Sequence, residues 1–295
     1  MAWLSGFSYG KQFTIIGSTA GPQTNYQMKL TVHKGNGTDS SSDVYLSGHC
    51  KDDFSDIRFT ISDGETKLDY WIEEYTSGDN ATVWIEFDSI PASPDSATFY
   101  LYYGNSKATS ESSGENTFPA FQGSLVYDGT QIIGDHPFAS NYAVEAKARV
   151  VSRGEGFAFL TFGGAHFEES SEEERELVVF FFQDELSARA LYTTAGARDP
   201  DNLLFDYTPI DTGVWYKVLL KSLPDIVRGF VDGQEIEEGH EAPYIGRELQ
   251  LVLEASNAVG EVEYAFMRPY VSPEPTWGTW VQWLMIETKF NRGFN

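Results

Sequence analysis

Four aspartates lie close together around one predicted turn, and they are the residues best suited to hold a metal ion. These are Asp52, Asp53, Asp56 and Asp63, and the turn is the Ser-Asp-Gly at residues 62–64. Calcium takes carboxylate oxygens that converge from loops. The spacing is not that of an EF-hand, and an acidic chain shows some clustering by chance, so a solvated loop rim is the competing interpretation. We therefore predict no obligatory cofactor, with calcium at these four aspartates as the candidate ion.

Motifs for catalysis are missing. The sequence has no paired histidines of the HExxH type, no GxSxG nucleophile turn and no phosphate loop. A retaining glycosidase needs two carboxylates about 5 Å apart, and no predicted strand carries acids at a suitable spacing. These observations predict a protein that is not an enzyme. The five histidines are dispersed along the chain, at His33, His49, His136, His166 and His240.

Three tryptophans near the C-terminus form the most distinctive aromatic pattern. Trp277, Trp280 and Trp283 recur every third residue, which suits one face of a helix, although a terminal strand with mixed faces is equally compatible. The run could pack back on its own domain. Because it follows the proline-rich Ser-Pro-Glu-Pro-Thr, we favour an arm, residues 276–295, that docks on a neighbouring subunit with the tryptophans as anchors.

The elements that must position these residues are strands. In the stretch from residue 53 to residue 104, β-branched and aromatic runs at 57–61 and 68–75 bracket the Asp63-Gly64 pair, which predicts a hairpin. Two further runs, at 81–87 and 97–103, predict two more strands. A β-rich domain is therefore predicted over residues 1–104.

This first third of the chain resembles a known family. The blocks WLSGFSYGKQFTI, DIRFTISDGETKLDYWIEEY, ATVWIEF and ATFYLYYGN follow one another as in the domain of unknown function 2341. The resemblance implies a β-sandwich module of archaeal and bacterial surface proteins and of tailed viruses, commonly followed by a concanavalin-like jelly roll. The family usually has a tryptophan at the position of Phe7 and an arginine at that of Gly10. It has no assigned catalytic residues, so none are carried over.

A second sandwich is predicted after a serine-rich linker at residues 105–117. Between residues 118 and 275, at least eight candidate strands alternate with turn residues and no helical pattern intervenes, which predicts a two-sheet jelly roll. The runs NYAVEAKARV, GVWYKVLL and VRGFVDGQEI resemble, in that order, concanavalin- or laminin-G-like modules. The fold class is thus all-β, with two tandem antiparallel sandwiches and a short aromatic tail.

Composition limits the partners. The net charge of −24, from 44 acidic and 20 basic residues, argues against nucleic-acid binding because the lysines and arginines are scattered along the sequence. Such a charge suits a saline, halophilic setting. The single cysteine, Cys50, cannot form an intramolecular disulfide and is interpreted as a small half-buried residue beside a strand. No signal peptide or transmembrane run is evident, so membrane insertion is not expected.

These observations favour a non-enzymatic structural or adhesive protein of an extracellular assembly. We expect a tailed-virus virion component, such as a capsid decoration, a turret or spike, or a tail fibre, located on the virion or an extracellular surface. Its expected partners are further copies of itself, other proteins of the assembly and host glycans. The alternative is a carbohydrate-binding protein of a cell surface, in which aromatic side chains on a sheet face stack on sugars. A glycoside hydrolase is the third option, and it has no motif in its favour.

Overall fold

The structure is a computed structural model that describes eight stretches of the chain. It divides into two compact units: unit 1 comprises Met1–Ser113 together with Ser272–Asn295, and unit 2 comprises Gly114–Val271. The all-β prediction is confirmed, since strands make up both units and the one described helix, α1 (Gly114–Thr117), has four residues. Among the described residues, no helix has the length and apolar character needed to span a bilayer. The described stretches are 3–138, 141–156, 158–167, 173–182, 186–193, 208–223, 226–235 and 249–284.

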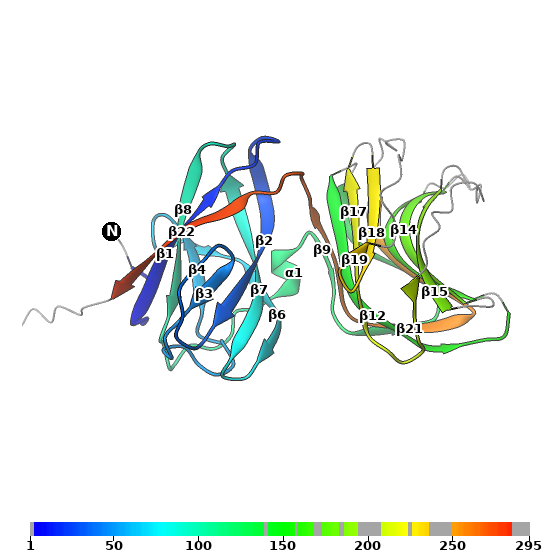
Figure 1. The fold of residues 1–295 in the computed structure, drawn as a ribbon, viewed down its shortest axis with the longest axis horizontal. Coiled ribbons are helices and arrows are strands. Elements are labelled where there is room, and N and C mark those ends of the chain that lie inside the picture. Colours follow the sequence, from blue (N-terminus) through cyan, green and yellow to red (C-terminus); the bar gives the residue numbers. More distant parts are fainter. Residues whose placement is uncertain are drawn as a thin grey trace, which may run out of the picture. The chain divides into compact units, whose positions relative to one another are not determined.

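Unit 1 contains a five-stranded sheet and a four-stranded sheet. The five-stranded β1 sheet has the order β22-β1-β8-β4-β5 and the four-stranded β2 sheet has the order β3-β2-β7-β6, with β3 parallel to β2 and every other pair antiparallel (Figure 1). Aromatic side chains fill the interior, including the fully buried Phe13, Phe59, Phe87 and Tyr26. The strands are β1 (Tyr9–Ile16), β2 (Gln23–His33), β3 (Asp43–Tyr45), β4 (Arg58–Ile61), β5 (Lys67–Leu68), β6 (Tyr70–Thr76), β7 (Asn80–Ile90), β8 (Ser96–Tyr103) and β22 (Thr276–Leu284).

The predicted hairpin around Gly64 exists but is shorter than expected. β4 and β5 share only two residue pairs, Phe59 with Leu68 and Thr60 with Lys67. The chain then leaves the β1 sheet, and β6 pairs with β7 in the β2 sheet. The single strand predicted at 68–75 is therefore divided between the two sheets. Gly64 adopts a positive φ of 81°, as a tight turn requires.

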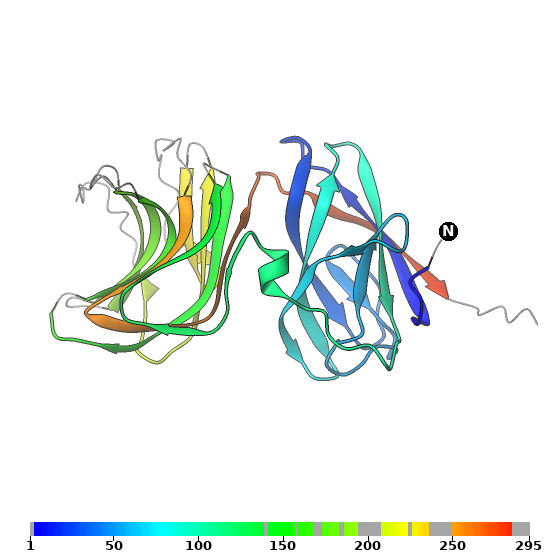
Figure 2. The same ribbon diagram turned by 180° about the vertical axis from the view of Figure 1, so that it is seen from behind.

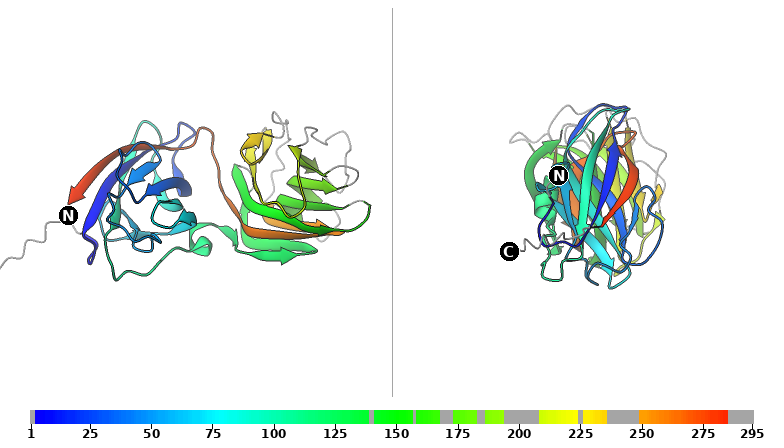
Figure 3. Two further views of the ribbon diagram at one scale, coloured as in Figure 1. Left: turned by 60° about the horizontal axis from the view of Figure 1, so that its bottom comes forward. Right: turned by 90° about the vertical axis from the view of Figure 1, so that its left-hand side faces the viewer.

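Unit 2 is built from a seven-stranded and a six-stranded antiparallel sheet (Figures 2 and 3). The β12 sheet has the order β10-β21-β12-β17-β18-β19 with β9 also on β21, and the β13 sheet has the order β11-β20-β13-β14-β15-β16. The strands are β9 (Ala120–Gln122), β10 (Leu125–Tyr127), β11 (Thr130–Phe138), β12 (Tyr142–Arg153), β13 (Phe159–Phe167), β14 (Glu173–Phe182), β15 (Leu186–Thr193), β16 (Thr208–Pro209), β17 (Tyr216–Leu223), β18 (Ile226–Val231), β19 (Gln234–Glu235), β20 (Leu249–Ser256) and β21 (Ala258–Pro269).

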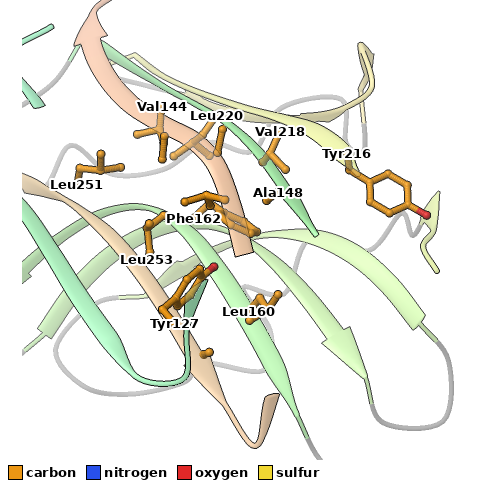
Figure 4. Packing of buried hydrophobic residues seen from close by; sticks show 14 of the residues in the cluster. Tyr127, Val144, Ala148, Leu160, Phe162, Tyr216, Val218, Leu220, Leu251 and Leu253 are labelled. Carbon is orange, nitrogen blue, oxygen red and sulfur yellow. The ribbon is translucent and has the colours of Figure 1, made fainter. Parts of the chain in front are cut away.

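The core of unit 2 lies between these two sheets. Val144 on β12 lies opposite Leu220 on β17, and Leu160 and Phe162 on β13 belong to the same buried cluster (Figure 4). Buried residues alternate with partly exposed ones along β12 and β17, as expected for strands with one face on the core. The residues between the core positions consequently point to the outer face of the β12 sheet.

The domain boundaries differ from those predicted. Residues 276–284 do not form an arm beyond the second sandwich: as β22 they complete the β1 sheet of unit 1 beside β1 (Figure 1). Unit 2 is therefore inserted between β8 and β22. The predicted linker at 105–117 is also corrected, because its first part is fastened to unit 1: Glu111 forms ion pairs with Arg58 and Lys67, and the Ser113 amide donates to the Tyr70 carbonyl.

Candidate functional site

Asp56 is a structural residue rather than a metal ligand. Its side chain is buried, and one carboxylate oxygen accepts a 2.9 Å hydrogen bond from the Lys51 amide. The other oxygen accepts hydrogen bonds from the amides of Gly104 and Asn105, at 3.0 and 3.2 Å. The carboxylate thus joins the loop before β4 to the end of β8 and has no lone pairs directed to a shared ion site.

The other three aspartates each have a separate local partner. Asp52 forms an ion pair with Lys34, and Asp53 accepts a hydrogen bond from the Ser55 amide that helps to lower the pKa of its carboxyl. In the turn before β5, hydrogen bonds from Thr66 hold the pKa of Asp63 below its ordinary value. The structure does not bring the four together, and no group of three or more metal-ligating side chains occurs among the described residues. The calcium prediction is not supported.

A β-bulge brings Trp277 and Trp280 to the same face of β22. Phe13 pairs with Trp280 and Ile15 pairs with Trp277, so two residues of β22 stand opposite Thr14 alone. The Thr279 amide donates to the Thr14 hydroxyl at 3.0 Å within this bulge. In a regular strand, residues three apart point to opposite faces. The bulge is therefore what allows both indoles to face the interior of unit 1.

The two indoles cover the aromatic core of their own chain. Trp280 stacks on Phe13 with a centroid distance of 4.7 Å, and Trp277 lies 5.8 Å from Trp280 in a stacked arrangement. The Trp280 indole N–H donates to the Ser41 carbonyl, and that of Trp277 donates to the Lys29 carbonyl. Both rings are therefore used within unit 1, and a contact of the partly exposed tryptophans with a neighbouring subunit stays a prediction.

Two parts of the predicted arm, the Trp283 side chain and residues 285–295, lie outside the described residues. Trp283 pairs with Gly10 through the backbone of β22.

Cys50 is buried more fully than the half-buried position expected of it. Only 6% of the residue is exposed, and burial raises the pKa of the thiol to about 12. A thiol with this pKa remains protonated at neutral pH, so it lacks the thiolate character of a reactive cysteine.

A basic surface on unit 2 was missed by the sequence analysis. Strands β12, β17 and β18 carry a single acidic residue, Glu145, in a chain with 44 acidic and 20 basic residues. The alternation of burial puts most of their charged residues on the outer face of the β12 sheet. We call this surface the basic face, and define it by Lys147, Arg149, Lys217, Lys221 and Arg228, together with the aromatic residues Trp215 and Phe230.

Like charges stand directly opposite each other on this face. Lys147 pairs with Lys217 across β12 and β17, and Lys221 pairs with Arg228 across β17 and β18. Directly opposed like charges destabilise a sheet. A chain with an excess of acidic residues has many ways to avoid such pairs. In each opposed pair one cation has a glutamate partner, Lys147 with Glu263 and Arg228 with Glu235.

The cations of the basic face differ in how they are neutralised. Arg149 pairs with Glu261 at 2.6 Å and its guanidinium lies 4.7 Å from the Trp215 ring. The Lys221 ammonium lies 5.3 Å from the Phe230 ring and 5.0 Å from the Tyr270 ring. The nearby carboxylates pair with other cations: Glu145 with Arg268, Glu235 with Arg228, and Glu263 with Lys147.

Lys221 is thus held by aromatic rings, and within the described part of the chain no carboxylate is paired with it. Cation–π contacts fix an ammonium group without cancelling its charge. The period-two placement of basic residues in EAKAR and YKVLLK was the available sequence signal, but it becomes a surface only once the register joins the strands.

Part of the chain matches the model of a known family. Residues 53–127 match the family model "Domain of unknown function (DUF2341)". This segment runs from the loop before β4 to the end of β10. It therefore includes residues 53–113 of unit 1 and the first strands of unit 2. The resemblance inferred from the sequence is thereby supported for this segment. No curated protein matches the chain.

Several solved structures are similar to part of the chain. The carbohydrate-binding module CBM66 from Bacillus subtilis is 14% identical with a TM-score of 0.37, covering 48% of this chain and 83% of its own. The Caenorhabditis elegans galectin LEC-6 is 13% identical with a TM-score of 0.30, covering 48% and 94%. The PL7 alginate lyase AlyA1 from Zobellia galactanivorans is 10% identical with a TM-score of 0.35, covering 63% and 90%. Likeness at this level concerns the β-sandwich fold and carries no functional argument.

Proposed function

We propose that this chain is a non-enzymatic carbohydrate-binding protein of a cell or particle surface, and that the basic face of unit 2 is its glycan-binding surface. The observation that carries the proposal is the combination, on one sheet face, of partly exposed aromatic rings and opposed cations. Aromatic rings offer apolar faces against which sugar rings can pack. Cationic side chains add charge-assisted hydrogen bonds to sugar oxygens.

A glycan array probed with the full chain tests this proposal. The double variant W215A/F230A removes both aromatic rings of the basic face. It is expected to lose the glycan signal while keeping the wild-type circular dichroism spectrum. Ile132→Ala is the matched control, because Ile132 is 50% exposed on β11 in the other sheet of unit 2. An array without any signal for the wild-type chain would contradict the proposal, as would equal signals for the wild type and the double variant.

A structural role in a tailed-virus particle is the second candidate. It is favoured by the insertion of unit 2 into unit 1, since two covalent connections suit a component that must keep two domains together under load. Such a component assembles with copies of itself or with other particle proteins. Light scattering after size exclusion, at low and high salt, is the test: a closed oligomer at both salt concentrations favours this role, and a monomer under both conditions argues against it.

A further inference from the structure

We infer that the basic face recognises a carboxylated glycan, that is, one containing uronic acids, and that the Lys221 ammonium is the group that binds the sugar carboxylate. This inference rests on the proposed glycan-binding function. It starts from the position of Lys221 on the outer face of β17, where it is partly exposed and directly opposite Arg228.

The described residues around Lys221 hold its positive charge in place and do not include a carboxylate paired with it. Phe230 and Tyr270 contact the ammonium from two sides, at 5.3 and 5.0 Å from their centroids. An aromatic ring face does not accept the N–H hydrogen bonds of the ammonium in the way that a carboxylate does. An ammonium has three N–H donors, and among the described residues no acceptor for those of Lys221 is found.

The neighbouring cation strengthens this site for an anion. Arg228 pairs with Glu235 at 3.0 Å, which fixes the guanidinium beside Lys221. Two cations on adjacent strands repel each other in the free protein. An anion that binds between them interacts with both cations, of which Arg228 is already paired with Glu235.

Carboxylate is the anion that suits this residue best. A lysine ammonium is a compact and strongly hydrated cation. A carboxylate is compact and strongly hydrated as well, so the two lose comparable hydration when they pair. The partly exposed Phe230 ring lies next to the ammonium and offers an apolar surface to the sugar ring that carries the carboxylate.

A nucleic acid fits this surface less well than an acidic glycan. Duplex DNA carries one negative charge per about 1.7 Å of helix axis, and its binding requires many lysine and arginine contacts. The basic face has five defined cations, of which three are paired with glutamates, in a chain of net charge −24. A uronate oligosaccharide has fewer charges, widely spaced, and repels the rest of the protein less.

The test compares hexagalacturonate with its fully methyl-esterified form by calorimetry on the full chain. The two oligosaccharides share their sugar backbone, and the ester carries an uncharged methyl ester in place of each carboxylate. We expect the ester to bind at least about tenfold more weakly than the acid. This is the usual scale for the loss of one charged hydrogen bond. Lys221→Met should weaken binding of the acid by a similar factor and leave binding of the ester unchanged, whereas Lys221→Arg should restore the preference. Lys107→Met, at an exposed lysine of unit 1, is the matched control.

Each contrary result has a distinct meaning. Equal binding of acid and ester, or equal behaviour of the Lys221→Met and Lys107→Met variants, overturns the inference but leaves glycan binding intact. If neither oligosaccharide binds, the inference is also wrong, and the proposed function fails only if the glycan array is blank too.

Equal affinity for a DNA duplex of similar length would identify a general polyanion site. A change in molar mass on substitution of Lys221 would identify the ligand as a second copy of the chain, and both results overturn the inference.

Discussion

Trp280 carries more of the stability of unit 1 than its partial exposure indicates. Its ring stacks on the fully buried Phe13, and its indole N–H donates to the Ser41 carbonyl at 2.9 Å. We expect Trp280→Ala to lower the free energy of unfolding of unit 1 by about 2–4 kcal/mol, since it removes ring contacts and a hydrogen bond together. The calorimetric transition of unit 1 measures this loss.

Val281, the next residue of β22, provides the comparison for that substitution. It is 48% exposed, so Val281→Ala is expected to change stability by no more than about 0.5 kcal/mol. Equal losses for the two variants would show that Trp280 does not pack on Phe13 in solution.

Glu86 makes the stability of unit 1 depend on pH. Burial on β7 raises the pKa of its carboxyl to about 7, and the charges of Asp69 and Asp88 act in the same direction, while a hydrogen bond from Gln27 opposes the shift. A carboxyl whose pKa is raised on folding contributes stability below its ordinary pKa of 4.5, and this contribution is lost as the pH rises through 7.

The isosteric variant Glu86→Gln removes this titration. It should match the wild type near pH 4.5 and be more stable at pH 8, by about 1 kcal/mol once screening by solvent is allowed for. Urea unfolding of unit 1 at the two pH values measures the difference. Glu65→Gln removes a carboxylate from an exposed turn and controls for net charge. An advantage of Glu86→Gln that is the same at both pH values would contradict the assignment.

At the scale of the element, β22 depends on the bulge at Gly278. A Cβ atom at this position would lie 2.3 Å from the Thr14 hydroxyl oxygen and 3.1 Å from the Thr14 carbonyl oxygen. Gly278→Val is therefore expected to displace β22 from β1 and to expose Trp277 and Trp280 to water. A red shift of tryptophan emission under native conditions measures the displacement. Thr276→Val places the same valine side chain at an exposed position of β22 without such a contact and should leave the spectrum unchanged.

The sequence predicted the strands better than their partners. Alternating β-branched and aromatic residues indicate a strand because they reflect local conformation and one buried face. They do not say which sheet receives it, so the division of residues 67–76 between β5 and β6 was not foreseen. The three-residue spacing of Trp277 and Trp280 suggested a helix or mixed faces, because a bulge depends on the partner strand and not on the bulged segment alone.

The basic face, for which we propose glycan binding, was harder to predict for the same reason. Lys147, Lys217 and Lys221 are scattered in the sequence, and only the register of β12, β17 and β18 makes them neighbours. The aspartates show the opposite case. Asp53 and Asp56 are close in sequence, which suggested a shared calcium site, yet their carboxylates accept hydrogen bonds from different backbone amides. Closeness in sequence proved a poor guide to convergence of side chains in this all-β chain.

For the whole molecule, the insertion of unit 2 makes the two units unequal. Unit 2 contains all the strands of both its sheets within residues 114–271. The sequence of unit 1 is interrupted by unit 2 between β8 and β22. Its β1 sheet is complete only when β22, which follows unit 2 in the sequence, pairs with β1. Without β22, the inner face of β1 around Phe13 loses the rings of Trp277 and Trp280. We therefore expect folding of unit 1 to require residues that follow unit 2 in the sequence.

Three fragments test this dependence. Residues 114–271 alone are expected to unfold cooperatively, because their core is self-contained. Residues 1–113 alone should lack a cooperative transition, whereas the same residues joined to 272–295 through a flexible Gly-Ser linker should regain it. The matched control is that fusion carrying W277A/W280A, which keeps the length of the chain but loses the two rings on Phe13. If residues 1–113 fold as stably as the fusion, β22 is an accessory strand, and the two sandwiches are independent domains despite the insertion.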